Sequence, residues 1–418
     1  MKNFKENLTA MLSYMKGFLK WLIIAVVTGT ICGVVGAVFH MGIDHATELR
    51  GHNPWILYFL PLGGIIIVFL YKISKMWENG GTNNVINAVK EKEQVPWKLA
   101  PLIFISTIIT HLLGGSSGRE GAALQLGGSI GSGTAKLFRQ GEKNRNIVIM
   151  CGMSGVFAAL FGTPITAAVF SLEVISVGVM YYGGLVPAMI SAVTANIVAG
   201  LFGVGATHFT IANIPGLEPT MLIRVIVLAV LAAVVSIIFC VVMENTAKGL
   251  KRFFKNDYLR AVIGAVMIII LTLIVGSQDY NGAGMNIVEK AISGEARWFD
   301  FILKLIFTAI TIGAGFKGGE IVPTFFVGAT FGCVAGGLLG IDPGFAASLG
   351  LIALFSGVVN CPLAAFILAI EIFGGEGAVY YALASGIGYM MSGYYGLYSS
   401  QNIVYSKLKA EYINRKTH

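Results

Sequence analysis

The stretch "GGSSGREGAALQLGG", residues 114–128, decides the fold because it interrupts an apolar part of the chain with glycine and serine. Arg119 and Glu120 stand next to each other in this break, and apolar runs flank it on both sides. The role of a carboxylate in such a place depends on what surrounds the chain.

The composition is that of a membrane protein. Of the 418 residues, 56% are hydrophobic and only 12% are charged, whereas soluble domains carry roughly 25% charged residues. Runs such as "TMLIRVIVLAVLAAVVSIIFCVVM" (220–243) are long enough to cross about 30 Å of hydrocarbon. We therefore expect a polytopic helical membrane protein.

The five cysteines form no CxxC pair and the histidines are dispersed, so neither a metal site nor a cofactor is expected.

Lysine and arginine gather in a few loops, and this pattern predicts the orientation of the chain. Residues 72–98, 136–145, 248–260 and the tail after Lys407 are rich in them, whereas 203–220 has none. By the positive-inside rule, the rich loops and both termini are cytoplasmic. The net charge of +8 is thus a topology signal and does not indicate nucleic-acid binding. The basic N-terminus lacks the pattern of a cleaved signal peptide.

The break lies between two loops that both read as cytoplasmic, 72–98 and 136–145. About 37 residues separate these loops, too few for two full spans of about 20 residues each and a turn. Two tilted or partial helices meeting inside the membrane are the alternative, with Glu120 at their junction. Non-helical backbone at that depth is tolerated only where protein or a water-filled cavity surrounds it. We therefore predict a binding site made of loop amides and the N-terminus of the following helix, an arrangement that favours anions.

The chain repeats itself at an offset of about 200 residues. The "GREG" at 118–121 has a counterpart in "GFKGGEIVP" (315–323), and "SGVFAALFGTPITAAVFSLEV" (154–174) has one in "SGVVNCPLAAFILAIEIF" (356–373). Glu320 then takes the position equivalent to Glu120. Loop 72–98 is lysine-rich, whereas loop 278–298 holds two basic and three acidic residues, which suggests that the second half is inverted. Inverted repeats of broken helices that meet near the midplane are the architecture of many ion transporters.

At these residues the sequence resembles the CLC family of anion channels and anion/proton antiporters. "GREGA" is similar to the family's GREGP element, with Ala122 in place of proline, and "GTPITAAVFSLE", "GGEIVPTFFVG" and "GLYSS" follow in the family's order. The resemblance implies an all-α fold of two inverted-topology repeats, about 20–205 and 220–400, with no cytoplasmic regulatory domain. It also implies a homodimer with one pathway in each subunit.

Three departures from the common family pattern resemble its fluoride/proton antiporter branch. The first anion-site motif, usually GSGIP, is "GTNNV" at 81–85. The usual GGIFAP is "GGEIVP", which places Glu320 inside the second loop. Val174 stands where chloride antiporters carry an internal proton glutamate. The resemblance therefore implies a plasma-membrane antiporter that exports fluoride in exchange for inward-moving protons.

The resemblance also assigns roles to residues. Glu120 is expected to gate the pathway and carry protons, and its alternative role is a structural partner of Arg119. Glu320 is expected to face the same site, or alternatively to act as a helix cap beside Lys317. Residues expected to bind the anion are Gly81, Thr82, Asn83, Gly118, Arg119, Gly121, Ile321, Val322 and Tyr398. Tyr405 is the rival of Tyr398, and Glu173 and Glu371 are interpreted as residues that end helices or pair near the membrane interface.

Other functions remain as alternatives. A chloride/proton antiporter or a passive anion channel of the same fold is possible, although the "GTNNV" motif and Val174 argue against the first. Two intramembrane glutamates argue against the second. An intramembrane enzyme would need a catalytic constellation such as His-Glu-x-x-His, which the sequence lacks, so no enzymatic activity is expected.

Overall fold

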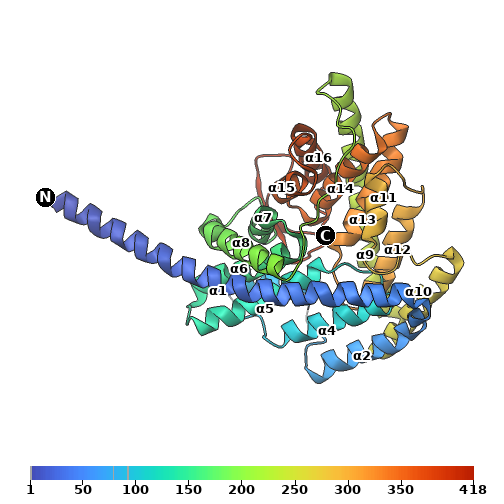
Figure 1. Ribbon diagram of the computed structural model, residues 1–418, viewed down its shortest axis with the longest axis horizontal. Helices are drawn as coiled ribbons and strands as arrows, with labels where there is room; N and C mark the ends of the chain where they lie inside the picture. Colours follow the sequence, from blue (N-terminus) through green and yellow to red (C-terminus); the bar gives the residue numbers. More distant parts are fainter. Residues whose placement is uncertain (1, 79, 92–93) are drawn as a thin grey trace.

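The computed structural model describes residues 2–78, 80–91 and 94–418, with residues 2–9 described by their backbone alone. The described chain is almost entirely helical, and α1 extends far from the body of the molecule at its N-terminal end (Figure 1). The elements of the first half are α1 (Lys2–His52), η1 (Pro54–Phe59), α2 (Leu60–Ile73), α3 (Thr82–Glu91), α4 (Leu99–Leu112), α5 (Glu120–Leu137), α6 (Glu142–Phe161), α7 (Pro164–Glu173), η2 (Tyr182–Gly184) and α8 (Leu185–Leu201).

The second half contains the same succession of helices. They are α9 (Pro219–Phe253), α10 (Asp257–Val275), α11 (Met285–Ile292), α12 (Asp300–Gly313), α13 (Ile321–Leu338), α14 (Pro343–Val359), α15 (Pro362–Phe373) and α16 (Ala378–Met391). The packing repeats as well: α5 lies against α6 as α13 lies against α14, and α1 lies against α8 as α9 lies against α16. The all-α fold with internal repeats is therefore confirmed.

The described chain combines helices long enough to span a membrane with shorter apolar helices. Among the described residues, seven helices are long and apolar enough to cross a bilayer. Others are short: α4 has 14 residues and α15 has 12. At 1.5 Å per residue, 14 residues extend only about 21 Å, less than the hydrocarbon thickness. The predicted partial helices on either side of the glycine break are thus present as α4 and α5.

The same local chemistry ends and starts matching helices in both halves. Gly162 ends α6, and Asn360 ends α14, each in the left-handed conformation that closes a helix. Two residues later Pro164 starts α7 and Pro362 starts α15, because proline fits the first turn of a helix, where no N–H partner is needed. This explains why the Gly-Thr-Pro and Asn-Cys-Pro segments occupy matching places.

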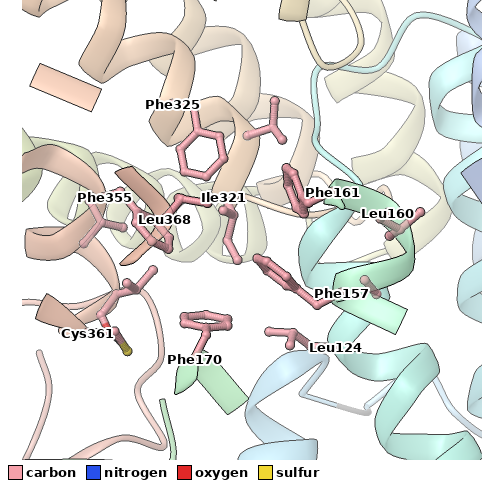
Figure 2. Packing of buried hydrophobic residues seen from close by; sticks show 14 of the residues in the cluster. Leu124, Phe157, Leu160, Phe161, Phe170, Ile321, Phe325, Phe355, Cys361 and Leu368 are labelled. Carbon is pink, nitrogen blue, oxygen red and sulfur yellow. Dashed lines mark hydrogen bonds between the residues drawn. The ribbon is translucent and has the colours of Figure 1, made fainter. Parts of the chain in front are cut away.

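An aromatic cluster joins the two halves in the core, and Figure 2 shows it beside Ile321 at the start of α13. Ring centroids of Phe161 and Phe325 are 6.1 Å apart, and those of Phe170 and Phe355 are 6.0 Å apart. Phe325 and Phe355 also touch, at 5.2 Å. Such pairs add about 0.5–1.5 kcal/mol each beyond their buried area, so the halves share one continuous core.

A small three-stranded sheet lies outside the helical pattern and was not expected from the sequence. It consists of β1 (Ser176–Val177), β2 (Asn402–Tyr405) and β3 (Tyr412–Lys416), with β1 parallel to β2 and β2 antiparallel to β3. The sheet fastens the C-terminal tail to the segment that follows α7. Lys407 in this tail donates to the backbone oxygen of Tyr389 and the hydroxyl of Ser392, both at 2.9 Å.

Candidate functional site

Two glycine loops from opposite halves meet as an antiparallel pair at the centre of the site. The Gly118 amide donates to the Gly319 carbonyl at 2.6 Å, and the Gly319 amide donates to the Gly118 carbonyl at 2.7 Å. Helix α5 begins directly after Gly118 and Arg119, and α13 begins directly after Gly319 and Glu320. Two helix N-termini, each a positive dipole end, therefore converge at one point.

This pairing corrects the expected equivalence of Glu120 and Glu320. Since Gly118 pairs with Gly319, Glu320 corresponds to Arg119, and Glu120 corresponds to Ile321. The sequence comparison was thus one residue out of register. The two loops hold their acids on different residues, so aligning glutamate with glutamate concealed the shift.

Glu120 is fully buried as the first residue of α5. Its Oε2 accepts the Arg119 amide at 2.9 Å, and Arg119 Nε lies 3.7 Å from Oε1. The Val322 amide at the start of α13 also interacts with this carboxylate. Oε1 has no hydrogen-bond partner of good geometry among the described residues. The carboxylate therefore occupies the place between the two helix N-termini, with one oxygen incompletely satisfied.

Gly118 must be glycine for this carboxylate to fit. A Cβ at this position would lie 2.6 Å from Glu120 Oε2 and 3.0 Å from Pro323 Cδ. The glycine thus serves close approach, as expected for a loop that brings its backbone to a bound group.

A cavity of about 190 Å³, here called the Tyr398 cavity, lies on one side of the glycine pair. It brings together five of the expected site residues from both halves of the chain. They are Gly81, Thr82, Asn83, Glu320 and Tyr398. The N-terminus of α3 points toward this cavity, because Gly81 and Thr82 precede and begin that helix.

Several polar groups of this cavity are held by bonds within the protein. The Thr82 hydroxyl donates to the Gly121 carbonyl at 3.2 Å, and Gln125 Nε2 donates to the same carbonyl at 3.2 Å. Asn83 Oδ1 accepts the Ser400 amide at 3.0 Å. The Thr82 proton is therefore already used, so the loop backbone is the better donor to a ligand at this position.

The two rival tyrosines lie in very different surroundings. The Tyr398 side chain is 2% exposed, lines the cavity, and its hydroxyl has no partner among the described residues. Tyr405 lies on β2, is 49% exposed, and packs against Tyr412. Of these two tyrosines, Tyr398 is the one whose phenol is available to a ligand in the cavity.

A second cavity of about 490 Å³, here called the Arg119 cavity, has a different lining. Arg119 and Val322 line it, together with Asn286 at the start of α11. Arg119 also contacts Asp44, at 3.4 Å. The starts of α3 and α11, which correspond in the two halves, thus open into different cavities, as an inverted repeat requires.

The expected site residues therefore fall into three groups. Gly81, Thr82, Asn83, Glu320 and Tyr398 line one cavity, while Arg119 and Val322 line the other. The remaining residues line neither cavity and lie at the glycine pair and the two helix starts: Gly118, Glu120, Gly121 and Ile321. Glu120 belongs to neither lining; its buried carboxylate contacts Arg119 and the Val322 amide, which line the Arg119 cavity.

Three residues of the Tyr398 cavity were missed by sequence reasoning as ligand-facing groups: Tyr71, Gln125 and Lys317. Tyr71 lies in the apolar helix α2, and its buried hydroxyl has no partner among the described residues. Gln125 lies on α5 one turn after Gly121. A polar residue in an apolar helix was the available signal, but the sequence alone does not tell which face it occupies.

Glu173 and Glu371 form a reciprocal pair of helix caps. Glu173, at the end of α7, accepts the amides of Leu363 and Ala364 at 3.2 and 2.8 Å. Glu371, near the end of α15, accepts the amides of Ile165 and Thr166 at 2.9 and 2.7 Å. Each carboxylate caps the helix of the other half, which goes beyond the expected helix-ending role.

Comparison with known proteins agrees with this geometry. The profile of the family described as voltage gated chloride channel matches residues 62–393. A chloride/fluoride channel protein of Pseudomonas syringae pv. tomato is 33% identical over 93% of this chain and 87% of its own. An H⁺/Cl⁻ exchange transporter of Vibrio campbellii is 24% identical over 84% of this chain and 81% of its own. The crystal structure of a CLC-type fluoride/proton antiporter matches with a TM-score of 0.88 and 29% identity, covering 92% of this chain and 98% of that one.

Proposed function

Because the chain belongs to the voltage-gated chloride channel family, the CLC family, we propose that it exchanges fluoride for protons across the membrane. The observation that carries the proposal is the position of Glu120. Its buried carboxylate lies where two helix N-termini converge, beside residues that line two different cavities. A helix N-terminus attracts anions, so the place that Glu120 occupies is also a place for a transported anion.

The proposed cycle follows from this competition. When Glu120 is ionised, its carboxylate fills the central position and blocks the path between the cavities. When it is protonated, it loses its attraction to the helix N-termini, and an anion takes its place. Each exchange of carboxylate for anion therefore moves a proton one way and an anion the other way.

The remaining residues support this exchange from the Tyr398 cavity. The Tyr398 hydroxyl is a free donor, and the amides at Gly81 and Thr82 begin α3 beside it. Glu320 lines the same cavity, and its carboxylate oxygen lies near Gly121 at the start of α5. We assign Glu320 the role of a second proton carrier on this side of Glu120.

Fluoride is the favoured anion because the cavity offers hydrogen-bond donors that can replace the water around it. Fluoride is small and strongly hydrated, so its release from water demands hydrogen-bond donors of high strength. Hydrogen bonds to a charged partner are worth about 1.5–3 kcal/mol each. A protonated Glu320 adds one such donor, and the similarity to the fluoride/proton antiporter structure supports the same assignment.

Export is the favoured direction. Fluoride enters cells as HF and is trapped as the anion by the higher internal pH, so inward proton flow suits outward fluoride flow. We place the protein in the plasma membrane with both termini cytoplasmic, in keeping with the basic loops. We also propose a homodimer with a separate pathway in each subunit.

Anion selectivity tests the proposal. Purified protein is placed in liposomes, and outward gradients of fluoride or of chloride, equal in size, are applied. Proton uptake that accompanies anion efflux is then read by an external pH electrode. We expect fluoride to drive protons at least about tenfold faster, equivalent to about 1.4 kcal/mol of preference. Liposomes without protein give the background leak. Equal rates, or faster chloride, would indicate a chloride/proton antiporter, and anion flux without proton movement would indicate a passive channel.

A further inference from the structure

Lys317 brings a positive charge to the wall of the Tyr398 cavity. It lies in the loop between α12 and α13 and lines the cavity together with Tyr71, Glu320 and Tyr398. Its ammonium forms no hydrogen bond or ion pair with any residue that the structure describes, although Glu320 is close enough to interact electrostatically. A cation without a bonded carboxylate is unusual inside a membrane protein, where such charges normally pair.

Two aromatic rings hold this cation. Lys317 Nζ lies 4.6 Å from the ring centroid of Tyr71 and 5.0 Å from that of Trp77, both within the range of a cation–π contact. The two rings meet edge to face, with an interplanar angle of 78°. A ring face attracts the ammonium through its quadrupole but carries no net charge. The rings thus fix Lys317 and leave its full charge available to the cavity.

Contacts with neighbouring elements position Trp77 in this aromatic cage. Trp77 hydrogen-bonds the carboxylate of Asp257 at the start of α10. Gly315 has a φ of +107°, and a Cβ there would lie 3.0 Å from Trp77 Cη2. Asp257 in turn pairs with Lys72 and Arg260, each at 2.7 Å. The Asp257 carboxylate therefore balances the charge of Arg260, whereas the charge of Lys317 faces the cavity.

We propose that Lys317 attracts the transported anion into the Tyr398 cavity and sets the affinity of that side of the pathway for fluoride. The inference rests on the proposed anion exchange and names a residue that this exchange needs. Glu120 and Glu320 both place carboxylates along the path, and these repel an anion whenever they are ionised. The caged ammonium offsets that repulsion without closing a salt bridge that would block the path.

Three variants test the proposal. Lys317→Met removes the charge and keeps an unbranched chain between the rings. Lys317→Arg keeps a cation that also stacks on aromatic faces. Lys98→Met is the matched control, because Lys98 is an exposed lysine just before α4 with no assigned contact to the cavity. Each is measured in liposomes as fluoride-driven proton uptake against fluoride concentration, at low and at high concentration of a salt with a bulky organic anion.

We expect Lys317→Met to raise the fluoride KM about tenfold, which corresponds to about 1.4 kcal/mol. It should also flatten the dependence of kcat/KM on ionic strength, because attraction by a charge is screened by salt. The proton-to-fluoride ratio should stay at the wild-type value. Lys317→Arg should retain a KM within about threefold of wild type, a difference of less than 1 kcal/mol, and Lys98→Met should match wild type.

A wild-type KM and salt dependence in Lys317→Met would overturn the proposal. So would an equal loss in Lys317→Arg and Lys317→Met with unchanged salt dependence, because that result marks a packing role. The wild-type protein tests the proposed function separately: fluoride-driven proton uptake in wild type supports the exchange whatever the variants do. If Lys317→Met does not fold, Trp77→Phe keeps the lysine and weakens the cage, and it should raise KM in the same direction by a smaller factor.

Discussion

Substitution of Glu173 by alanine is expected to destabilise the protein through loss of a helix cap that joins the two halves. Its carboxylate accepts two amides at the start of α15, those of Leu363 at 3.2 Å and Ala364 at 2.8 Å. The side chain of Glu173 is 8% exposed, so little water is available to replace the carboxylate. The Ala364 amide would then remain buried without an acceptor, and the Leu363 amide would remain partly buried without one.

The magnitude follows from these contacts. A hydrogen bond to a charged group contributes about 1.5–3 kcal/mol, and an N-terminal cap replaced by alanine costs about 0.5–2 kcal/mol. Removing the charge also removes the cost of burying it, which places the net loss for Glu173→Ala at about 2–4 kcal/mol. Glu371 forms the corresponding cap in a more exposed position, because its hydrogen bond from the Ile165 amide lies at the surface. Glu371→Ala should therefore cost only about 1–2 kcal/mol.

The assay is unfolding of purified protein in mixed micelles titrated with SDS, followed by tryptophan fluorescence. Glu173→Gln is the conservative control and should fall between wild type and alanine, because its amide oxygen still accepts one bond without the charge. The two caps lie at opposite ends of the helix pair α7 and α15, so the double variant should be additive within about 0.5 kcal/mol. A smaller effect for Glu173→Ala than for Glu371→Ala would refute the reasoning, since burial is what distinguishes the two caps.

Three further predictions concern transport and topology. Glu120→Gln should abolish fluoride-driven proton uptake in liposomes, because an amide cannot carry the proton that we assign to the Glu120 carboxylate; wild-type uptake would rule out this role. Glu320→Gln should lose most fluoride turnover while remaining monodisperse in size-exclusion chromatography. Unchanged turnover would mean that Glu320 serves only as the N-cap residue of α13. Cysteines introduced at Lys98 and at Asn286, both exposed, should react with an impermeant maleimide from opposite sides of the membrane, whereas reaction from one side only would contradict the inverted topology. The five native cysteines are buried, which keeps the background low.

Much of the architecture could be predicted because it depends on local patterns. The glycine break, the short distance between basic loops and the matching segments 154–174 and 356–373 all report constraints that act within one helix or turn. They predicted the partial helices α4 and α5, the internal repeat and the presence of Glu120 at a helix start. The family resemblance added the residues of the first loop and Tyr398, which the structure brings together with Glu320 in one cavity.

The parts that could not be predicted depend on contacts between distant segments. The one-residue register between the halves is fixed by the hydrogen bonds of Gly118 with Gly319, and no local pattern encodes such a pairing. Tyr71 and Lys317 meet only because α2 and the loop before α13 pack together. The cross-capping by Glu173 and Glu371 is equally non-local, although the conspicuous carboxylates at the ends of two apolar helices gave a hint.

The paired glycine loops also limit how the pathway can change its open side. Two short backbone hydrogen bonds, at 2.6 and 2.7 Å, join the two halves beside Glu120. A rocking motion that separated the halves here would break both hydrogen bonds. If these hydrogen bonds persist, the exchange we propose requires side-chain movement around a fixed backbone, with Glu120 as the side chain that moves. The amides of Gly118 and Gly319 should accordingly resist hydrogen–deuterium exchange at every fluoride concentration and pH at which the protein turns over, and rapid exchange during turnover would mean that the halves do part.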